Sequence, residues 1–180
     1  MQTIVFDTET TGLLKPDVVD ISQQPKIIEL YACKLDEDFN LIGEFDVLLN
    51  PGHNLSSNIT KITGITDEDL ADAVSFPDIY HDLADFFLGV KRVVAHNLAF
   101  DIGMLKNELA RIDCVTKFPW PPEHICTVER SIHIKGFRLN LQRLHQELLE
   151  YGFKDAHRAK EDVFALVRCY HALCERGDID

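Results

Sequence analysis

The sequence predicts an α/β domain with a mixed five-stranded sheet and helices on both of its faces. Three strand-like runs come first, and helical and strand-like runs alternate after them. Strands joined by short loops pair antiparallel, whereas strands joined through a helix pair parallel. A chain of 180 residues has the length of one domain. We therefore expect a single domain over residues 1–180, with three antiparallel strands followed by βα units.

The first part of the chain carries the three consecutive strands. Gln2–Phe6 is a short β-rich run, and Ile27–Leu35 and Leu41–Leu49 are longer runs of the same kind. The segment 36–40 (DEDFN) joins the last two as a hairpin loop. Prolines and polar residues predict a loop over Lys15–Pro25.

Helices and short strands alternate in the rest of the chain. Short strands are expected at Arg92–Ala95 and Ile125–Val128, and Pro51–Ser57 is expected to be a loop. Thr66, followed by acidic residues, has the pattern of a helix N-cap. Apolar residues at helical spacing predict further helices over Asp78–Leu88, Leu98–Ile112, Leu141–Leu149 and Ala159–Cys174.

The charge is acidic and unevenly distributed. The chain has 18 Lys and Arg against 30 Asp and Glu, a net charge of -12, which excludes a uniformly basic nucleic-acid binder. Residues 1–90 hold 17 acids and 4 bases, whereas residues 91–180 hold 13 acids and 14 bases. Within 130–160, 7 bases and 3 acids are interleaved with Phe137 and Phe153. This segment could follow a phosphate backbone, or it could be a solvated helix face above core phenylalanines.

The cysteines and the hydropathy pattern indicate a cytoplasmic protein. The 5 cysteines form no CxxC pair and show no zinc-site spacing, so we expect free thiols in a reducing compartment. No apolar run reaches the roughly 18 residues that span a bilayer, and no signal peptide is recognisable. We expect no membrane partner.

Two carboxylates stand at the end of the first strand. Asp7 and Glu9 are two residues apart, so in an extended chain they point in the same direction. Like charges at this separation repel unless a cation lies between them, and clustered carboxylates suit Mg²⁺ or Mn²⁺. A solvated strand end is the alternative for this pair alone.

Two further acids and a histidine complete a constellation. Asp101 follows a predicted strand, and Asp162 lies beside the buried stripe of the last helix, five residues after His157. Alone, an Asp in a first helical turn serves the helix dipole, and a lone histidine is usually structural. Together, four acids from three converging elements have the layout of a two-metal phosphoryl-transfer site. His157 could then accept the proton of the attacking water near neutral pH.

Three motifs stand in order along the chain, Phe6–Gly12 (FDTETTG), His96–Asp101 (HNLAFD) and His157–Asp162 (HRAKED). With these motifs the chain resembles the DEDDh, or DnaQ-like, family of 3′–5′ exonucleases. Arg158 stands where the tyrosine branch of the superfamily would carry its tyrosine, so the histidine branch is favoured. Ile27–Leu30 and Ile62–Thr66 also look like family segments.

The resemblance implies a ribonuclease H-like fold and a set of roles. Asp7, Glu9, Asp101 and Asp162 would hold two Mg²⁺ or Mn²⁺ ions, and His157 would be the general base. The reaction would release nucleoside 5′-monophosphates from a 3′ end. Further residues would contact the substrate: Thr10, Gly12 and Leu13 at the terminal nucleotide, with Leu13 as an apolar wedge, and Asn97 and Phe100 in the nucleotide pocket. Independently of the resemblance, the charge of Arg158 beside His157 makes it the expected phosphate contact.

Substrate and partners are less sharply indicated. The likeness of the first motif to the DNA-acting branches of the family implies DNA, with single-stranded DNA as the expected partner, and an exoribonuclease is the alternative. A non-catalytic binding module and an internally cutting enzyme of the same fold are further alternatives. Many relatives have histidine where this chain has Thr63, which puts substrate grip there in question. A role in DNA repair or replication beside a polymerase fits the family, as does a monomer or a homodimer.

Overall fold

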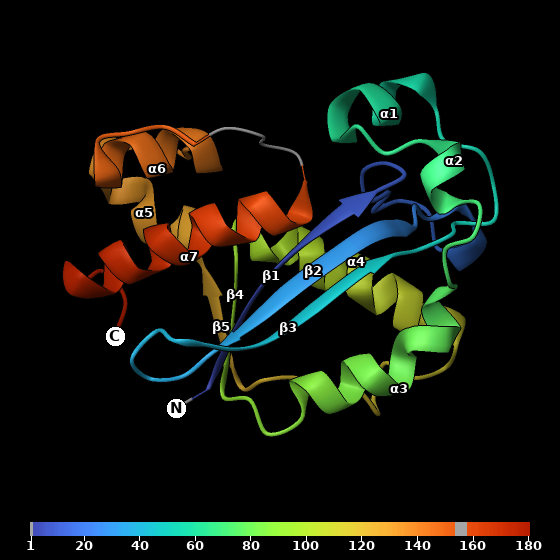
Figure 1. The fold of residues 1–180 in the computed structure, drawn as a ribbon, viewed down its shortest axis with the longest axis horizontal. Helices are drawn as coiled ribbons and strands as arrows, with labels where there is room; N and C mark the ends of the chain where they lie inside the picture. The colour runs from blue at the N-terminus through green and yellow to red at the C-terminus, as the bar shows by residue number, and fades with distance from the viewer. Residues whose placement is uncertain (1, 154–157) are drawn as a thin grey trace.

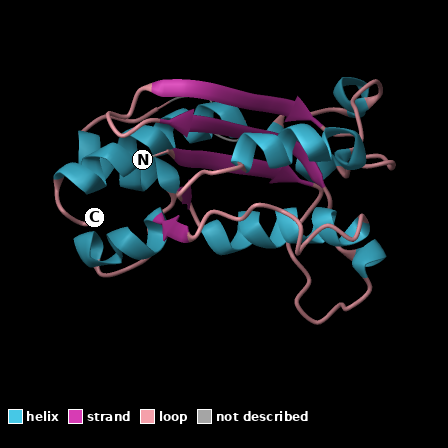
Figure 2. Ribbon diagram, turned by 90° about the horizontal axis from the view of Figure 1, so that it is seen from below, coloured by secondary structure: helices cyan, strands magenta, loops and turns pink. Residues whose placement is uncertain are grey.

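A mixed sheet lies at the centre of the molecule, with helices against both of its faces (Figure 1, Figure 2). The structure is a computed structural model that describes residues 2–153 and 158–180. Within these residues five strands form one sheet, in the order β3-β2-β1-β4-β5. The strands are β1 (Thr3–Thr10), β2 (Ile27–Leu35), β3 (Leu41–Leu48), β4 (Arg92–Ala95) and β5 (Glu123–Cys126).

The direction of each strand pair follows from its connection. β1 pairs antiparallel with β2, and β2 pairs antiparallel with β3. β4 runs parallel to both β1 and β5, and segments that contain helices make these connections. The predicted order of antiparallel strands followed by βα units is thereby confirmed.

The helices begin at polar residues in most cases. Side chains of Ser56, Thr66 and Asn140 accept backbone N–H groups at the starts of their helices, and Asp69 completes a capping box with Thr66. The N-cap expected at Thr66 is therefore confirmed. The helices are α1 (Ser57–Thr63), α2 (Asp67–Leu70), α3 (Phe76–Phe87), α4 (Leu98–Arg111), α5 (Thr127–Lys135), α6 (Leu141–Leu149) and α7 (Ala159–Glu175), with a 3₁₀ turn at Ile21–Gln23.

Alternation along β1 creates two hydrophobic cores. Ile4 and Phe6 pack in the core that α3 and α4 share with the sheet. Val5 points to the other face and packs with α7. Because side chains alternate along a strand, the residues at odd positions of β1 belong to the face that α7 covers. This parity decides where the acidic residues of β1 point.

The first strand is longer than the sequence predicts. A strand over Gln2–Phe6 was expected, whereas β1 runs to Thr10 because β2 offers it pairing partners as far as Ile27. Asp7 and Glu9 therefore lie inside a paired strand and not after its end, which fixes their direction more firmly.

The fifth strand ends before the predicted position. The strand expected at Ile125–Val128 is wrong at its C-terminal end, since β5 ends at Cys126 and Thr127 begins α5. β4 pairs with β5 only from Arg92 to Ala95, and Ala95 is the partner of Cys126. The β-branched residues after Cys126 thus have no strand to pair with, and they continue as a helix. The Pro51–Ser57 loop is confirmed except at Ser57, which begins α1.

Over the part of the chain that is described, no helix combines the length and the apolar character that crossing a membrane requires.

Candidate active site

Three carboxylates meet where β1 passes the start of α7. Asp7 and Glu9 point to the same face of β1, and Asp162 lies in the first turn of α7, which covers that face. One carboxylate oxygen from each of the three lies within 4.8 Å of the others, and all three side chains are half-buried. The spacing of two along a strand thus places Asp7 and Glu9 together, as the sequence predicts.

The electrostatics of this cluster are unfavourable without a cation. Burial, followed by repulsion from Asp101 and Glu9, raises the pKa of Asp7 well above its ordinary value. Burial and the nearby Asp162 carboxylate raise the pKa of Glu9 to about 8. Oxygen ligands in a compact acidic group are the set that Mg²⁺ and Mn²⁺ prefer, and a divalent ion would reverse the repulsion. The donor set therefore fits a divalent metal.

Asp101 adjoins this cluster from the opposite face of β1. It is buried in the first turn of α4, and its Oδ1 accepts hydrogen bonds from the Thr8 N–H at 3.2 Å and from Thr8 Oγ1 at 2.8 Å. Burial raises its pKa to about 7, and the hydrogen bonds from Thr8 oppose that rise. Among the described residues Asp101 is outside the 4.8 Å group, although its charge acts on Asp7 and Glu9.

The predicted general base, His157, lies outside the described residues. Its neighbour in the chain, Arg158, is described, and its guanidinium forms an ion pair with Glu29 of β2, with 2.7 Å between Nη2 and Oε1. The phosphate contact predicted for Arg158 stays a prediction. Sequence reasoning missed Glu29 as a partner, although an acid within the apolar run Ile27–Leu35 was a signal that it is paired.

The turn after β1 exposes one leucine and partly buries the next. Thr10 is buried, and its hydroxyl donates to the Gly12 carbonyl oxygen at 2.8 Å. Leu13 is 78% exposed, and its role as a wedge against nucleotides stays a prediction. Leu14 instead packs against Gly103 of α4, where a Cβ atom would lie 2.6 Å from Leu14 Cδ1. The absence of a side chain at Gly103 therefore makes room for Leu14, the neighbour of the exposed Leu13.

The second motif brings its residues to the same end of the sheet. Asn97 is exposed in the turn between β4 and α4, with a left-handed backbone (φ 72°) that asparagine tolerates better than most residues. Phe100 is half-buried in the first turn of α4. Their predicted contacts with a nucleotide are not tested by these positions.

Thr63 contributes to the end of a helix. Its side chain is buried, with the hydroxyl donating to the Ile59 carbonyl oxygen at 3.0 Å and accepting the Ile65 N–H at 3.1 Å. These bonds, with Gly64 in the left-handed conformation, terminate α1. The side chain at this position thus serves the helix end, which gives a physical reason for threonine here.

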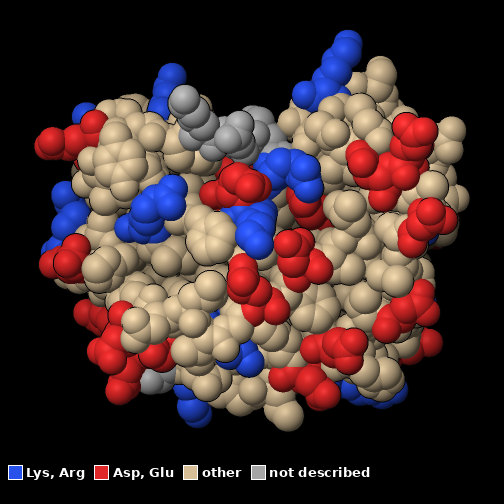
Figure 3. All heavy atoms as spheres, viewed as in Figure 1, with Lys and Arg blue, Asp and Glu red and all other residues tan. Residues whose placement is uncertain are grey.

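Most of the described bases in the segment 130–160 lie beside acids. Lys135 lies 2.8 Å from Glu147, and Lys160 lies 3.4 Å from Glu44. On the face of the molecule that Figure 3 draws, acidic and basic side chains of the described residues are interspersed, without a continuous basic band. Phe137 is 53% exposed and available for stacking, whereas Phe153 packs on His145.

Comparisons with known proteins agree on one family. The profile of the RNase_T family, described as exonuclease, matches residues 4–170. The DNA polymerase III PolC-type of Bacillus subtilis is 36% identical over 97% of this chain and 12% of its own length. A Mycobacterium tuberculosis protein named for exonuclease and endonuclease activities is 32% identical over 96% of this chain and 26% of its own length. The chain thus spans about a quarter or less of these relatives.

Solved structures confirm the ribonuclease H-like fold. The nuclease domain of 3′hExo, named as a DEDDh family member bound to rAMP, has a TM-score of 0.75 at 17% identity, covering 98% of this chain and 92% of that one. Exonuclease X, in complex with 5′ overhanging duplex DNA, has a TM-score of 0.64 at 20% identity, covering 97% and 93%.

Proposed function

This chain belongs to the RNase_T exonuclease family, and on that premise we propose that it is a metal-dependent 3′–5′ exonuclease domain that acts on DNA. It would release nucleoside 5′-monophosphates from 3′ ends. The observation that carries the proposal is the cluster of Asp7, Glu9 and Asp162, with Asp101 beside it, in a chain whose motifs match the family in order. The whole of residues 1–180 would form this one domain.

The four acids would hold two Mg²⁺ or Mn²⁺ ions. Asp7, Glu9 and Asp162 supply the compact oxygen cluster, and Asp101 supplies a buried carboxylate from the other side. When bound, such ions activate water and stabilise the charge on the leaving oxygen. Thr8 keeps the Asp101 carboxylate oriented through its two hydrogen bonds.

The chain's own side chains would place the 3′ end and move the proton. Leu13, projecting from the turn after β1, would contact the last bases, and Asn97 and Phe100 would line the pocket of the terminal nucleotide. Thr10 and Gly12 hold the shape of that turn. His157 would accept a proton from the attacking water, since a histidine pKa near 6.5 suits this role at neutral pH.

DNA is proposed as the substrate because of the relatives' names. The Bacillus subtilis protein is named as a DNA polymerase, and the Exonuclease X structure is a complex with 5′ overhanging duplex DNA. An RNA substrate is the second candidate, since one neighbour of the same fold recognises a histone mRNA stem-loop. A polymerase or a repair assembly would be the partner of a DNA-acting domain.

Defined substrates test this proposal. We expect a 5′-labelled single-stranded DNA to be shortened stepwise with Mg²⁺ and to stay intact in EDTA. Duplex DNA and RNA of the same sequence would rank the substrates. A covalently closed single-stranded circle should resist the protein, and cleavage of that circle would exclude the exonuclease proposal.

Replacement of the predicted base tests the proton transfer separately. The variant His157→Ala should lose roughly 10²–10⁴-fold in kcat, the usual contribution of a general base. The measurement is the pH dependence of kcat on the single-stranded DNA. An unchanged kcat at neutral pH would remove His157 from this role and leave the assignment of the acids intact.

A further inference from the structure

Glu29 is a buried acid that the proposed mechanism does not use. It lies in β2 directly opposite Glu9 of β1, and its side chain is only 3% exposed. Its charge raises the pKa of both Asp7 and Glu9, so it lies close enough to disfavour the acidic cluster. A buried carboxylate beside other acids is costly unless it is paired, so Glu29 needs partners that compensate its charge.

Two groups at the start of α7 satisfy this carboxylate. Arg158 donates to Glu29 Oε1 from Nη2 at 2.7 Å and from Nε at 3.1 Å. The backbone N–H of Ala159, the first residue of α7, donates to Oε2 at 3.0 Å. Both oxygens of Glu29 are thus bound by consecutive residues of another element.

This contact replaces the usual helix cap. Ser56, Thr66 and Asn140 cap their own helices with side chains next to the helix start. Arg158, at the N-cap position of α7, makes no such bond, and Glu29 of β2, on the face of the sheet that α7 covers, accepts the Ala159 N–H instead. A cap supplied by a strand fixes the helix start to that strand, which a local cap cannot do.

The fixed start lies one turn from a proposed metal ligand. The Asp162 N–H donates to the Arg158 carbonyl oxygen at 3.0 Å, so the first hydrogen bond of α7 joins the anchored residue to the ligand. We propose that Glu29 and Arg158 are a positioning pair that sets Asp162 against Asp7 and Glu9. This inference rests on the proposed function. It differs from the phosphate contact predicted for Arg158, because here the guanidinium binds the Glu29 carboxylate and not the substrate.

A double-mutant cycle with Mn²⁺ as the probe tests the pair. The proteins are the wild type, Glu29→Gln, Arg158→Gln and the double variant, and Mn²⁺ affinity is measured by calorimetry without substrate. We expect each single variant to lose about 10–100-fold in Mn²⁺ affinity, as loss of a group that orients metal ligands usually does. The double variant should lose no more than the worse single variant, because both changes break one contact.

Kinetics separate positioning from substrate binding. On single-stranded DNA, the single variants should lower kcat about 10–100-fold and change KM less than threefold. Arg158→Lys keeps the positive charge but loses the planar guanidinium that donates from two nitrogens, so we expect it to resemble Arg158→Gln. A raised KM with unchanged kcat in Arg158→Gln, together with a silent Glu29→Gln, would overturn the inference and make Arg158 a phosphate contact.

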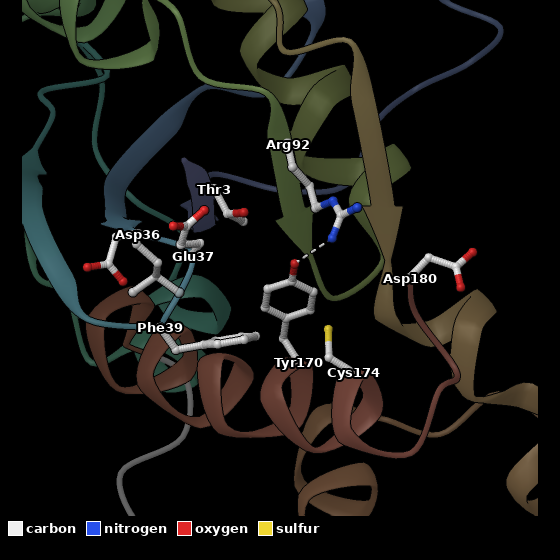
Figure 4. Close-up of a pocket in the computed structure, with 9 residues that line it drawn as sticks. Thr3, Asp36, Glu37, Phe39, Arg92, Tyr170, Cys174 and Asp180 are labelled. Atoms are coloured by element: carbon white, nitrogen blue, oxygen red, sulfur yellow. Dashed lines mark hydrogen bonds between the residues drawn. The ribbon is translucent and has the colours of Figure 1, made fainter. Parts of the chain in front are cut away.

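A second arginine offers a matched control at the other end of the sheet. Arg92 of β4 lies 2.8 Å from Glu123 of β5 and also donates to Tyr170 of α7 (Figure 4). Glu123→Gln removes this ion pair far from the acidic cluster, and we expect wild-type Mn²⁺ affinity and kcat. Wild-type Mn²⁺ affinity in Glu29→Gln would overturn the inference. An inactive wild type would instead count against the proposed function, because the Mn²⁺ measurement needs no turnover.

Discussion

The two ends of α7 are both tied to the sheet by an arginine, but their surroundings differ. At the start, Arg158 of the helix reaches Glu29 of a strand, beside the cluster of Asp7, Glu9 and Asp162. Near the far end, Arg92 of a strand donates to Tyr170 of the helix at 2.9 Å (Figure 4).

At the far end of α7 opposite charges lie beside one another, whereas at the near end acids cluster together. Asp178, just beyond α7, lies 2.9 Å from Arg176 and 3.0 Å from His133. At the near end burial and repulsion from neighbouring acids raise the pKa values of Asp7 and Glu9, and burial raises that of Asp101. The same helix thus carries a structural end and an end whose charges require a further ligand. Perturbed acids of this kind mark functional sites more often than structural ones.

The largest expected effect comes from removing one acid of the near end. Asp7→Asn should reduce nuclease activity to the level of an EDTA-treated control, because ligands that act as a unit fail together. Without divalent ions its melting temperature should equal or exceed that of the wild type, since the substitution removes a buried repulsive charge. Activity on labelled DNA and a thermal melt check both. Normal activity in Asp7→Asn would contradict the metal-site assignment.

A second effect is a pH dependence of stability in EDTA. Unfolded glutamate releases its proton near pH 4.3, whereas Glu9 in the fold keeps it to about pH 8. The folded state binds more protons in this window, so stability should fall as the pH rises from about 5 to about 8. Thermal melts of the wild type and Glu9→Gln measure this, and the variant should show a smaller fall. Saturating Mn²⁺ should remove most of the difference.

An intermediate effect concerns the turn after β1. Gly103→Ala places a methyl group where Leu14 now packs, so the turn that carries Leu13 must shift. Overpacking costs about 1–3 kcal/mol and alanine gains about 1 kcal/mol in a helix, so the stability change should be small. KM for DNA should rise roughly two- to tenfold, equivalent to about 1 kcal/mol of lost contact. Steady-state kinetics check this. An unchanged KM would contradict a role of Leu13 in substrate binding.

The smallest expected effect is a loss of stability when an ion pair near the far end of α7 is removed. Glu123→Gln removes an ion pair whose acid is 47% exposed, so we expect at most about 1 kcal/mol of lost stability. Denaturant unfolding measures this loss. A large decrease in activity with an unchanged fold would contradict the division of α7 into a structural end and a functional end.

The sequence predicts where the four acids lie, because their placement depends on local geometry. A spacing of two along a strand puts Asp7 and Glu9 on one face, and Asp101 and Asp162 each lie in a first helical turn. The contact of Glu29 was not predictable, because it joins residues 129 apart and periodicity does not say which charges meet. The predicted C-terminal end of β5 was wrong because its partner β4 has only four residues. Beyond Cys126 the lack of a pairing partner outweighs the β propensity of the residues that follow.

The alternation along β1 makes this strand intolerant of insertions. Asp7 and Glu9 face α7, whereas Thr8 between them holds Asp101 on the other face. One extra residue before Asp7 would turn the acids toward α4 and the threonine toward α7. Changes in chain length that preserve the site are therefore confined to the loops, and a one-residue insertion after Ile4 should abolish the site without changing a single ligand.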